Sequence, residues 1–279
     1  MRTPKKSLLA AVAALTTGVL ALSISTAPGS SAQTLQQDQP VKPTIVLVHG
    51  AWADGSSWSA VTSRLQSDGY TVNVEANPLR SVASDAQYLR DLLASIPGPI
   101  VLVGHSYGGM VITNAATGNP NVRALVYVDA FIPDQGDSVG ALASAQPGSA
   151  LDPNSSITAV PIHDANGTVI NADVYIKPAQ FPALFAGGIP VEQAAVLAAG
   201  QRPLTASTLG EPFTGVPAWK TIPSWDLIGT ADKVLPPAEQ EIMAHRAGAH
   251  IVKVNAPHLS MVAKPGAVTE LIETAAHSS

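Results

Sequence analysis

The sequence of 279 residues predicts an α/β fold, with a mostly parallel sheet, helices on both of its faces and a small inserted cap. From Thr44 onward, short continuous apolar runs alternate with segments of helical periodicity, which predicts buried strands joined by helices. The alternation stops at Pro133 and resumes near Pro223, and the stretch between is rich in Pro, Gly, Ala and Ser. Because each helical crossover covers one face of the sheet, this order indicates parallel strands with an insertion late in the series.

The first part of the series contains the strands and helices that precede the insertion. The apolar runs that predict strands are TIVLV (44–48), TVNVEA (71–76), PIVLVG (99–104) and ALVYVDA (124–130). The helices between them are recognised by apolar residues three or four positions apart. They contain Trp58, Val61 and Leu65 before Gly69, then Leu89, Leu92, Leu93 and Ile96 after an opening at Ser84-Asp85, and finally the segment Met110–Thr117.

The insertion, from about residue 133 to 217, is expected to form the cap. A hairpin is predicted around the Asn166-Gly167 turn, followed by two helical pieces at 178–186 and 191–199. The series then resumes with the strands SWDLIG (224–229) and HIVKVNA (250–256) and with helices at about 237–247 and 265–276. These strands extend the sheet beyond the cap.

The first 32 residues have the layout of a secretory signal peptide. A basic stretch, MRTPKK, precedes an uncharged run from Ser7 to Ile24, and small residues end the segment at Ala32, where we place the cleavage. Residues 33–42 are polar and predict a linker, so the α/β domain is expected to span residues 43–279. These features predict a secreted or periplasmic protein with no membrane anchor after cleavage. The alternative is an uncleaved anchor helix formed by the apolar run.

Composition argues against several kinds of partner and site. The formal net charge is −5, and because Arg2, Lys5 and Lys6 fall in the signal segment, the rest of the chain carries −8. An acidic surface repels phosphate backbones, which argues against nucleic-acid binding. The chain has no cysteine, which excludes disulfides and a cysteine nucleophile, and no H-E-x-x-H or similar pattern predicts a metal site. Nothing in the sequence predicts the oligomeric state.

A reactive serine is predicted in VLVGHSYGGMVI (101–112). The segment Gly104-His105-Ser106-Tyr107-Gly108 fits the pattern G-x-S-x-G. It stands between a predicted strand and a predicted helix, as the sharp turn of a nucleophile elbow requires. The glycines permit the tight turn, and Gly109 is expected to leave room for substrate. We expect His105 to point away from the serine and only to pack.

A serine hydroxyl needs a base, and the base needs an orienting acid; in this architecture both follow the serine at the ends of strands. Asp232 follows SWDLIG, and His258 follows HIVKVNA. Because the carboxyl ends of parallel strands meet at one edge of a sheet, Ser106, Asp232 and His258 can converge as a catalytic triad. Asp129, at the end of ALVYVD, is the alternative acid, whereas Asp226 lies inside a strand and is a poor candidate.

The sequence also predicts the groups that would hold the oxyanion formed by attack on an ester. The segment His49-Gly50-Ala51-Trp52 follows the first strand, and we assign the backbone N–H groups of Ala51 and Tyr107 to the oxyanion hole. His49 itself is expected to brace this loop. The residues expected to line the substrate pocket are Trp52, Trp58, Trp219 and Met261.

These segments resemble the α/β-hydrolase superfamily, in particular its branch of plant methylesterases and hydroxynitrile lyases with bacterial esterase relatives. The likeness runs from about Thr44 to Ala276 and includes VLVHGAW, VLVGHSYGGM, GTADKVLPP and NAPHLSMVAKP. The segment KPAQFPALFAGGIPVEQAAVLAAGQRPLT is similar to the small cap of that family. The resemblance implies an α/β-hydrolase fold, the triad and oxyanion hole named above, a small-molecule ester as substrate, and no cofactor.

The expected activity is therefore that of a carboxylesterase acting on small to medium esters. The lyases of this branch carry a lysine directly after the catalytic histidine and a threonine in place of Gly50, whereas this chain has Leu259 after His258. A lactonase or amidase would use the same triad, and proteins of this fold can bind small molecules without catalysis. A lactonase, an amidase, a lyase and a non-catalytic binder stay as alternatives.

Overall fold

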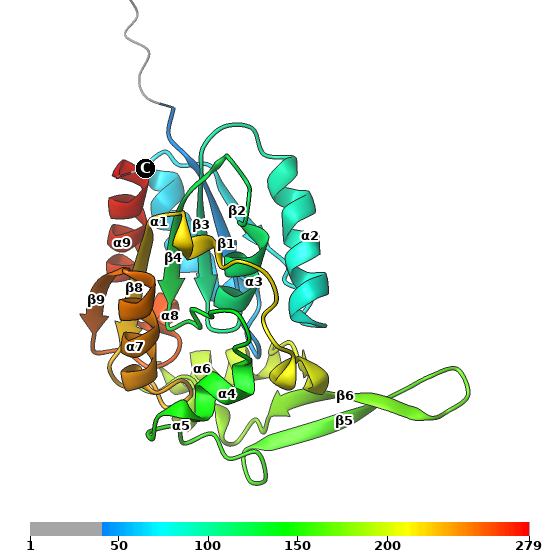
Figure 1. Ribbon diagram of the computed structural model, residues 1–279. Coiled ribbons are helices and arrows are strands. Elements are labelled where there is room, and N and C mark those ends of the chain that lie inside the picture. The colour runs from blue at the N-terminus through cyan, green and yellow to red at the C-terminus, as the bar shows by residue number, and fades with distance from the viewer. Residues whose placement is uncertain (1–40, 279) are drawn as a thin grey trace, which may run out of the picture. The chain divides into compact units, whose positions relative to one another are not determined.

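Six parallel strands form the central sheet of the computed structural model, which describes residues 41–278 (Figure 1). Every neighbouring pair of strands in the sheet is parallel, so the predicted fold class is confirmed. The predicted signal peptide, its cleavage site at Ala32 and most of the predicted linker lie outside the described residues. The strands, in their order across the sheet, are β2 (Val72–Glu75), β1 (Thr44–Val48), β3 (Ile100–His105), β4 (Val122–Val128), β8 (Ser224–Gly229) and β9 (His250–Val254).

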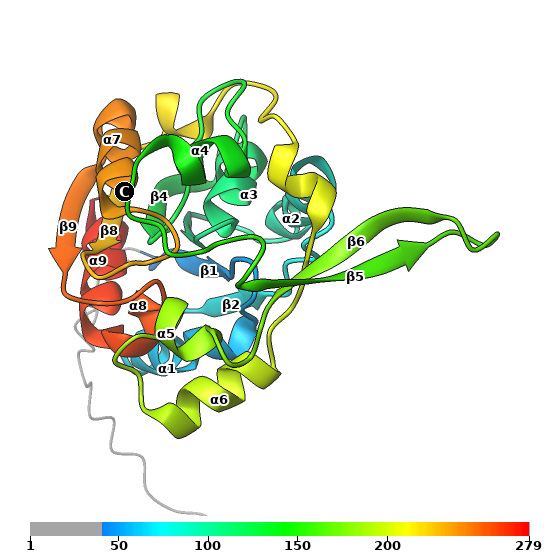
Figure 2. The ribbon, with the colours of Figure 1, turned by 90° about the horizontal axis from the view of Figure 1, so that it is seen from below.

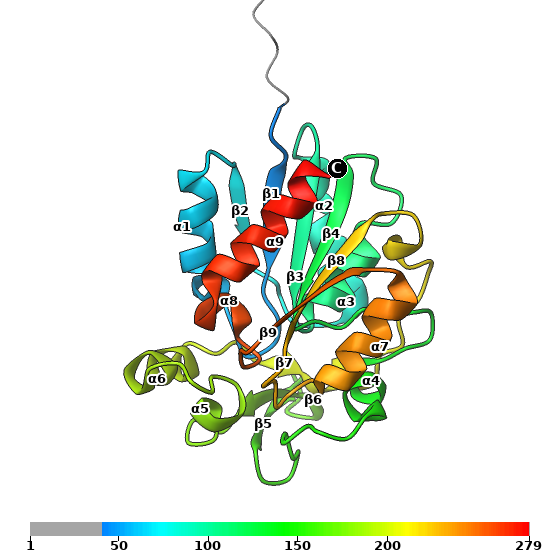
Figure 3. The ribbon, with the colours of Figure 1, turned by 90° about the vertical axis from the view of Figure 1, so that its left-hand side faces the viewer.

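Helices cover both faces of this sheet, as Figures 2 and 3 show. One face carries α1 (Ser59–Ser67) and α9 (Pro265–His277), and the other carries α2 (Val82–Ala94), α3 (Gly108–Ala115) and α7 (Pro237–Ala247). The central strands β1, β3 and β4 are mostly apolar because both of their faces are covered, whereas the edge strands β2 and β9 contain polar and exposed residues. In β1 and β3, the residues from Ile45 to Val48 and from Ile100 to Val103 are almost completely buried.

The start of α2 differs from the position that the sequence predicts. The helix begins at Val82 rather than at Ser84-Asp85, because the hydroxyl oxygen of Ser81 accepts a hydrogen bond from the backbone N–H of Ser84 and caps the helix. Ser84 and Asp85 therefore lie in its first turn. The carboxylate of Glu211 also accepts the N–H groups of Val82 and Ala83, which ties the cap segment to this helix end.

Most of the segment between β4 and β8 lies at the carboxyl ends of the sheet strands, and its last part runs back to the amino end of β8 (Figure 1). A small antiparallel sheet of order β5-β6-β7 forms its centre. Its strands are β5 (Ile157–His163), β6 (Val169–Ile176) and β7 (Leu204–Thr205), and its helices are α4 (Val139–Ala145), α5 (Phe181–Leu184) and α6 (Val191–Ala199). The hairpin of β5 and β6 projects beyond the rest of the segment (Figure 2).

Shorter helices complete the described chain. They are η1 (Gly55–Trp58), η2 (Ala206–Gly210), η3 (Ala218–Lys220) and α8 (Ser260–Ala263). Between residues 41 and 278, no helix is both long enough and apolar enough to cross a membrane.

Candidate active site

Ser106 lies in the sharp turn between β3 and α3, and its backbone adopts the left-handed conformation with φ of 51°. This conformation is unfavourable for a residue with a side chain, so the surrounding packing must hold it in place. The flanking glycines allow that packing. A Cβ atom on Gly104 would lie 2.8 Å from the backbone of Gly108, and a Cβ atom on Gly108 would lie 2.7 Å from the carbonyl oxygen of Val48. Both positions exclude any larger residue.

Gly109 has a different role from the one that the sequence suggested. A Cβ atom at this position would lie 2.1 Å from the carbonyl oxygen of Phe131, in the segment that follows β4. The missing side chain therefore leaves space for the neighbouring backbone and not for substrate. Gly109 sets how closely α3 approaches the end of β4.

The three residues expected to form a triad meet at the carboxyl edge of the sheet. His258 Nε2 lies 2.8 Å from Ser106 Oγ, and His258 Nδ1 lies 2.7 Å from Asp232 Oδ2. A carboxylate can only accept a hydrogen bond, so Nδ1 carries the imidazole proton and Nε2 is free to accept the serine proton. The side chains of His258 and Asp232 are fully buried.

Burial keeps the imidazole of His258 neutral at rest by lowering its pKa. Burial also raises the pKa of the Asp232 carboxyl group, and three donors oppose that shift. The N–H groups of Val234 and Leu235 donate to Asp232 Oδ1, and the side-chain amide of Gln240 donates to Asp232 Oδ2. Gln240 lies on α7, and no sequence pattern marked it as part of the site.

Asp129, the alternative acid, is also buried but binds other groups. Its carboxylate accepts hydrogen bonds from the N–H of Gly229 and from both the N–H and the hydroxyl of Ser260. It therefore joins the loop after β8 to the segment after His258. Asp226 lies inside β8, and among the described residues neither of its carboxylate oxygens has a hydrogen-bond partner. Of these three carboxylates, Asp232 is the one bonded to His258.

The segment 49–52, which we call the oxyanion loop, lies beside the nucleophile elbow. The N–H of Gly50 donates to His105 Nδ1 and so is not free for a substrate. Within residues 41–278, the N–H groups of Ala51 and Tyr107 have no acceptor, although both residues are buried. Unpaired buried donors are rare and call for an acceptor. Ala51 and Tyr107 line the same cavity as Ser106, so these donors are available to an oxygen atom of a bound substrate.

The side chains around this loop hold it in place. The hydroxyl of Tyr107 donates to Asp85 Oδ2, and the side-chain amide of Asn77 donates to the carbonyl oxygen of His49. The ring of His105 is fully buried and lies against the ring of His258, with 4.9 Å between the centroids. Its Nε2 lies 2.8 Å from the carbonyl oxygen of His258. His105 thus makes polar contacts that the expectation of a packing residue did not include.

A cavity of about 390 Å³ opens over Ser106, within the range typical of small-molecule sites. Its walls come from α4, from the bases of β5 and β6, and from β7. None of the residues that line it within the described chain is charged. The apolar lining includes Phe131, Val139, Leu151, Ile157, Val174, Leu204 and Leu209.

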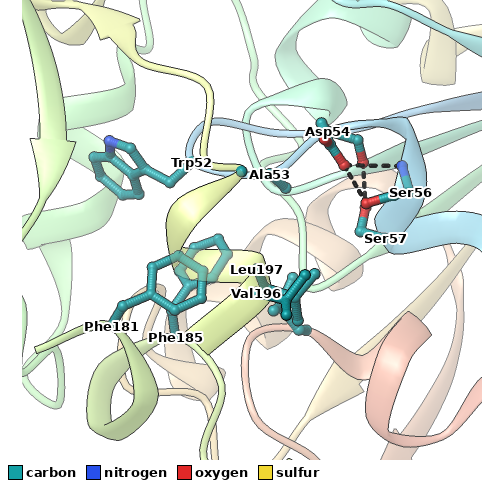
Figure 4. A pocket seen from close by; sticks show the side chains of 11 residues that line it. Trp52, Ala53, Asp54, Ser56, Ser57, Phe181, Phe185, Val196 and Leu197 are labelled. Carbon is teal, nitrogen blue, oxygen red and sulfur yellow. Dashed lines mark hydrogen bonds between the residues drawn. The ribbon is translucent and has the colours of Figure 1, made fainter. Parts of the chain in front are cut away.

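A second cavity, of about 130 Å³, lies on another side of Trp52 (Figure 4). Trp52 lines both cavities, and Phe181 and Phe185 lie below it in the smaller one. The indole of Trp52 donates a hydrogen bond from its N–H to the carbonyl oxygen of Val174. Its ring also makes an edge-to-face contact with the ring of Phe185, with 6.1 Å between the centroids. The ring is therefore held in one position, and Trp52 belongs to the walls of both cavities.

Three of the residues expected in the pocket do not line the cavity over Ser106. Trp219 lies on η3, where its indole N–H donates to the carbonyl oxygen of Pro133 and Lys220 lies over its ring. Met261 on α8 and Trp58 on η1 are completely buried in the hydrophobic core. These three residues make packing contacts elsewhere, and of the four residues expected in the pocket Trp52 alone lines this cavity.

The site contains no candidate metal centre. Across residues 41–278, no group of three or more His, Asp or Glu side chains is arranged to hold a metal ion.

Comparison with known proteins identifies the fold and the family. A model of the alpha/beta hydrolase family matches residues 45–271. Among curated proteins, the chain is 39% identical over 110 residues to a carbendazim hydrolyzing esterase of a Nocardioides species, which covers 35% of this chain and 46% of that protein. It is 29% identical over 118 residues to methylesterase 8 of Arabidopsis thaliana, covering 37% of this chain and 43% of the relative. Each alignment thus spans less than half of the curated relative.

A solved structure extends the likeness over most of the described chain. The crystal structure of polyneuridine aldehyde esterase matches with a TM-score of 0.72 and 19% sequence identity, over 84% of this chain and 98% of that one. At this identity the match establishes a shared fold.

Proposed function

The chain belongs to the α/β hydrolase family, and from this premise we propose that it is a serine carboxylesterase that cleaves small to medium carboxylic esters. The observation that carries the proposal is the position of His258, which bonds to Ser106 Oγ with one ring nitrogen and to Asp232 with the other. This arrangement has the geometry of a base with its nucleophile and its orienting acid. The esterase relatives support the same activity.

In the proposed acylation step, His258 Nε2 takes the hydroxyl proton of Ser106 while Oγ attacks the ester carbonyl carbon. The carbonyl oxygen becomes an oxyanion and accepts hydrogen bonds from the N–H groups of Ala51 and Tyr107. Asp232 stabilises the imidazolium that forms and keeps its orientation. The imidazolium then protonates the leaving alcohol, and the acyl group stays on Ser106.

In the proposed deacylation step, water replaces the alcohol beside His258. Nε2 takes a proton from the water, and the resulting hydroxide attacks the acyl carbon. The same N–H donors hold the second oxyanion. His258 returns the proton to Ser106 Oγ, and the carboxylic acid leaves.

The lining of the larger cavity supports a neutral, largely apolar ester as substrate. Its walls are mostly apolar, and the polar side chains among them, such as Ser144, Gln146 and Ser149, are neutral. None of the lining residues within the described chain is charged, so a charged acyl group would lose its hydration without gaining an ionic partner. Lyase chemistry would need a positive group to stabilise departing cyanide. Lys233 and Lys264 line a separate groove that does not contain Ser106, which favours hydrolysis.

A fluorophosphonate probe and a short-chain chromogenic ester test the proposal together. The wild-type protein should react with the probe at Ser106 and hydrolyse the ester. In Ser106→Ala both should be lost, with a fall in kcat of about 10⁴-fold or more. An unlabelled wild type, or a Ser106→Ala variant that keeps its activity, would show that the proposal is wrong.

Ser144→Ala is the matched control for this experiment. Ser144 lines the same cavity, but its hydroxyl donates to the carbonyl oxygen of Gly140 and has no base beside it. Labelling and hydrolysis should persist in this variant. A parallel panel of esters, lactones and amides identifies the preferred bond, and preference for an ester over the matching lactone and amide supports the carboxylesterase assignment.

We further propose that the protein is exported and that residues 1–32 are removed. The proposal rests on the basic start, the apolar run and the small residues before Gln33. Peptide mass spectrometry of protein recovered from outside the cytoplasm should find Gln33 as its first residue. A mature chain that still carries Met1 would contradict cleavage.

A further inference from the structure

His105 is a buried titratable residue that the proposed reaction does not use. It ends β3 directly before Ser106, and its ring is completely buried. The ring lies against three others, with centroid distances of 4.9 Å to His258, 6.2 Å to Phe185 and 6.5 Å to Trp58. The imidazole therefore stands between the nucleophile strand and the loop that carries the catalytic base.

Both nitrogen atoms of this ring face backbone groups of the site. The N–H of Gly50 donates to Nδ1 at 3.3 Å, so Nδ1 must carry a lone pair and not a proton. Nε2 faces the carbonyl oxygen of His258 at 2.8 Å, which can only accept, so Nε2 carries the proton and donates. These two contacts define one neutral tautomer.

The two contacts join three parts of the site through one side chain. Gly50 precedes Ala51, whose N–H is assigned to the oxyanion hole, and His258 supplies the base. We propose that His105 is a positioning residue that holds the oxyanion loop and the backbone of His258 at fixed distances from Ser106. The inference rests on the proposed function, because it concerns the groups that perform that reaction.

The surroundings of the ring favour the neutral form that these contacts require. Burial lowers the pKa of His105 well below its ordinary value, and the neighbouring imidazoles of His258 and His49 lower it further. A protonated Nδ1 would place one N–H against the N–H of Gly50 and would break that contact. The neutral tautomer is thus part of the geometry of the oxyanion loop.

Three substitutions distinguish a positioning role of His105 from a role in packing alone, because each keeps a different property of the imidazole ring. In His105→Asn, the amide oxygen can take the place of Nδ1 and accept from Gly50. In His105→Gln, the amide nitrogen can take the place of Nε2 and donate to the carbonyl oxygen of His258. His105→Phe keeps the flat ring and its volume but loses both hydrogen bonds.

If His105 is a positioning residue, His105→Asn and His105→Gln should be more active than His105→Phe. A displacement of about 1 Å in a catalytic group can cost about 100-fold in rate, so His105→Phe should lose about 100-fold in kcat with KM changed less than threefold. His105→Asn and His105→Gln should each lose about 10-fold in kcat, since each keeps one of the two hydrogen bonds of the ring. If Phe equals or exceeds both amides in kcat, or if only KM and Tm change, the ring only packs and the proposal is overturned.

A matched control tests whether any buried hydrogen bond would have the same effect. The hydroxyl groups of Tyr127 and Thr113 form a buried pair at 2.8 Å between β4 and α3, and neither hydroxyl is bonded to a residue of the triad. Tyr127→Phe removes that contact and should lower Tm while kcat stays within twofold. A loss of kcat in Tyr127→Phe equal to that of the His105 variants would count against a specific role for His105.

Nitrogen-15 NMR of histidine in the wild-type protein provides a test that needs no variant to fold. His105 should give a neutral ring with the proton on Nε2 at every pH from 5 to 8. A proton on Nδ1, or a charged ring at pH 7, would overturn the proposal. Loss of Ser106 labelling in the wild type would instead refute the proposed function, so the two failures are distinguishable.

Discussion

His258 can act as a base only while its Nε2 is unprotonated. Burial lowers the pKa of this imidazole below its ordinary value of 6.5, so the neutral form persists to lower pH than it would in an exposed histidine. We therefore expect the acid limb of kcat/KM to have its midpoint below pH 6.5. Initial rates of ester hydrolysis from pH 4 to 8 measure this midpoint.

The lowered pKa of His258 also affects the stability of the fold, so the rate measurement needs a control for unfolding. Below pH 6.5 the unfolded chain binds a proton at this histidine and the folded chain does not, so stability falls as the pH falls through that range. Circular dichroism at each pH distinguishes unfolding of the protein from protonation of His258 in the folded protein. A midpoint at or above 6.5 in fully folded protein would contradict the expectation.

Trp52 is expected to limit the size of the ester. Trp52 lines both the cavity over Ser106 and the smaller cavity in Figure 4, and we expect Trp52→Ala to join the two spaces. The variant should shift the preference among p-nitrophenyl esters from short acyl chains toward longer ones. Relative kcat/KM values from acetate to octanoate measure the shift.

Val196→Ala is the control for this change, since Val196 lines only the smaller cavity and is 71% exposed. It should leave the chain-length profile as in the wild type. Removal of a buried tryptophan costs roughly 3–5 kcal/mol of stability, so Trp52→Phe serves where the alanine variant does not fold. An unchanged profile in a folded Trp52→Ala variant would mean that the ring does not limit substrate size.

At the scale of single residues, the sequence predicted those whose position follows from the order and direction of the sheet strands. Ser106, Asp232 and His258 each come just after a strand, and parallel strands bring such positions together. Gln240 and the hydrogen bonds of His105 depend on how helices and loops pack, which no local pattern encodes. Trp219 was misplaced for the same reason, because an aromatic residue is equally suited to a pocket and to a surface contact.

At the scale of single elements, β8 contains an unusual buried titratable group. Asp226 is completely buried in this strand, and within the described chain its carboxylate oxygens have no hydrogen-bond partner. Burial raises its pKa well above the ordinary value of 3.8, and the nearby Asp129 adds to the shift. Above pH 3.8 the Asp226 carboxyl group therefore keeps its proton in the folded protein and releases it in the unfolded chain. Stability falls as the pH rises from there toward the pKa in the folded protein.

Asp226→Asn removes this titration and should stabilise the protein more at pH 8 than at pH 4. The gain in Tm should therefore be larger at pH 8 than at pH 4, because the cost of keeping the Asp226 side chain protonated in the wild type grows with pH. Thermal melts of both proteins at both pH values measure it. Asp68→Asn, at an exposed carboxylate, is the control, and an equal gain at both pH values would contradict the expectation.

The elements themselves were predicted where their pattern is strong. The apolar runs at 44–48 and 224–229 coincide with β1 and β8, and the helical pieces at 191–199 and 237–247 coincide with α6 and α7. Helix α4 was not predicted, because VGALASA contains small residues and no stripe of large apolar ones. Its buried residues are only Val139 and Leu142, yet it forms a wall of the larger cavity.

For the molecule as a whole, the projecting hairpin is separable from the site. Only its base reaches the cavity, through Ile157 on β5 and Val174 on β6, whereas Val169 and Ile170 near its tip are more than half exposed. Replacing residues 163–170 by an Asn-Gly turn keeps the contacts of Asn171 with Ser207 on η2 and should leave kcat/KM within twofold. It should also reduce self-association, because it removes exposed apolar side chains next to unpaired strand edges.

Steady-state kinetics and light scattering of the shortened protein test this pair of expectations. A polar variant of full length, Val169→Thr with Ile170→Thr, is the control that keeps the hairpin but removes its apolar tip. A loss of more than 10-fold in kcat/KM after shortening would show that the tip contributes to catalysis.

Left-handed backbone conformations are distributed unequally between the two ends of the sheet. Before β2, β3, β4 and β9 the chain turns through Gly69, Gly98, Gly118 and Gly248, which adopt positive φ without strain. After β1, β2, β3 and β4 the positive φ values belong to Trp52, Leu79, Ser106 and Asp129. Each of these costs roughly 1–2 kcal/mol. The protein thus has a relaxed end and a strained end, and the reacting groups lie at the strained one. Efforts to raise thermostability should therefore begin at the amino ends of the strands, because relief of strain at the other end would remove the conformations that catalysis needs.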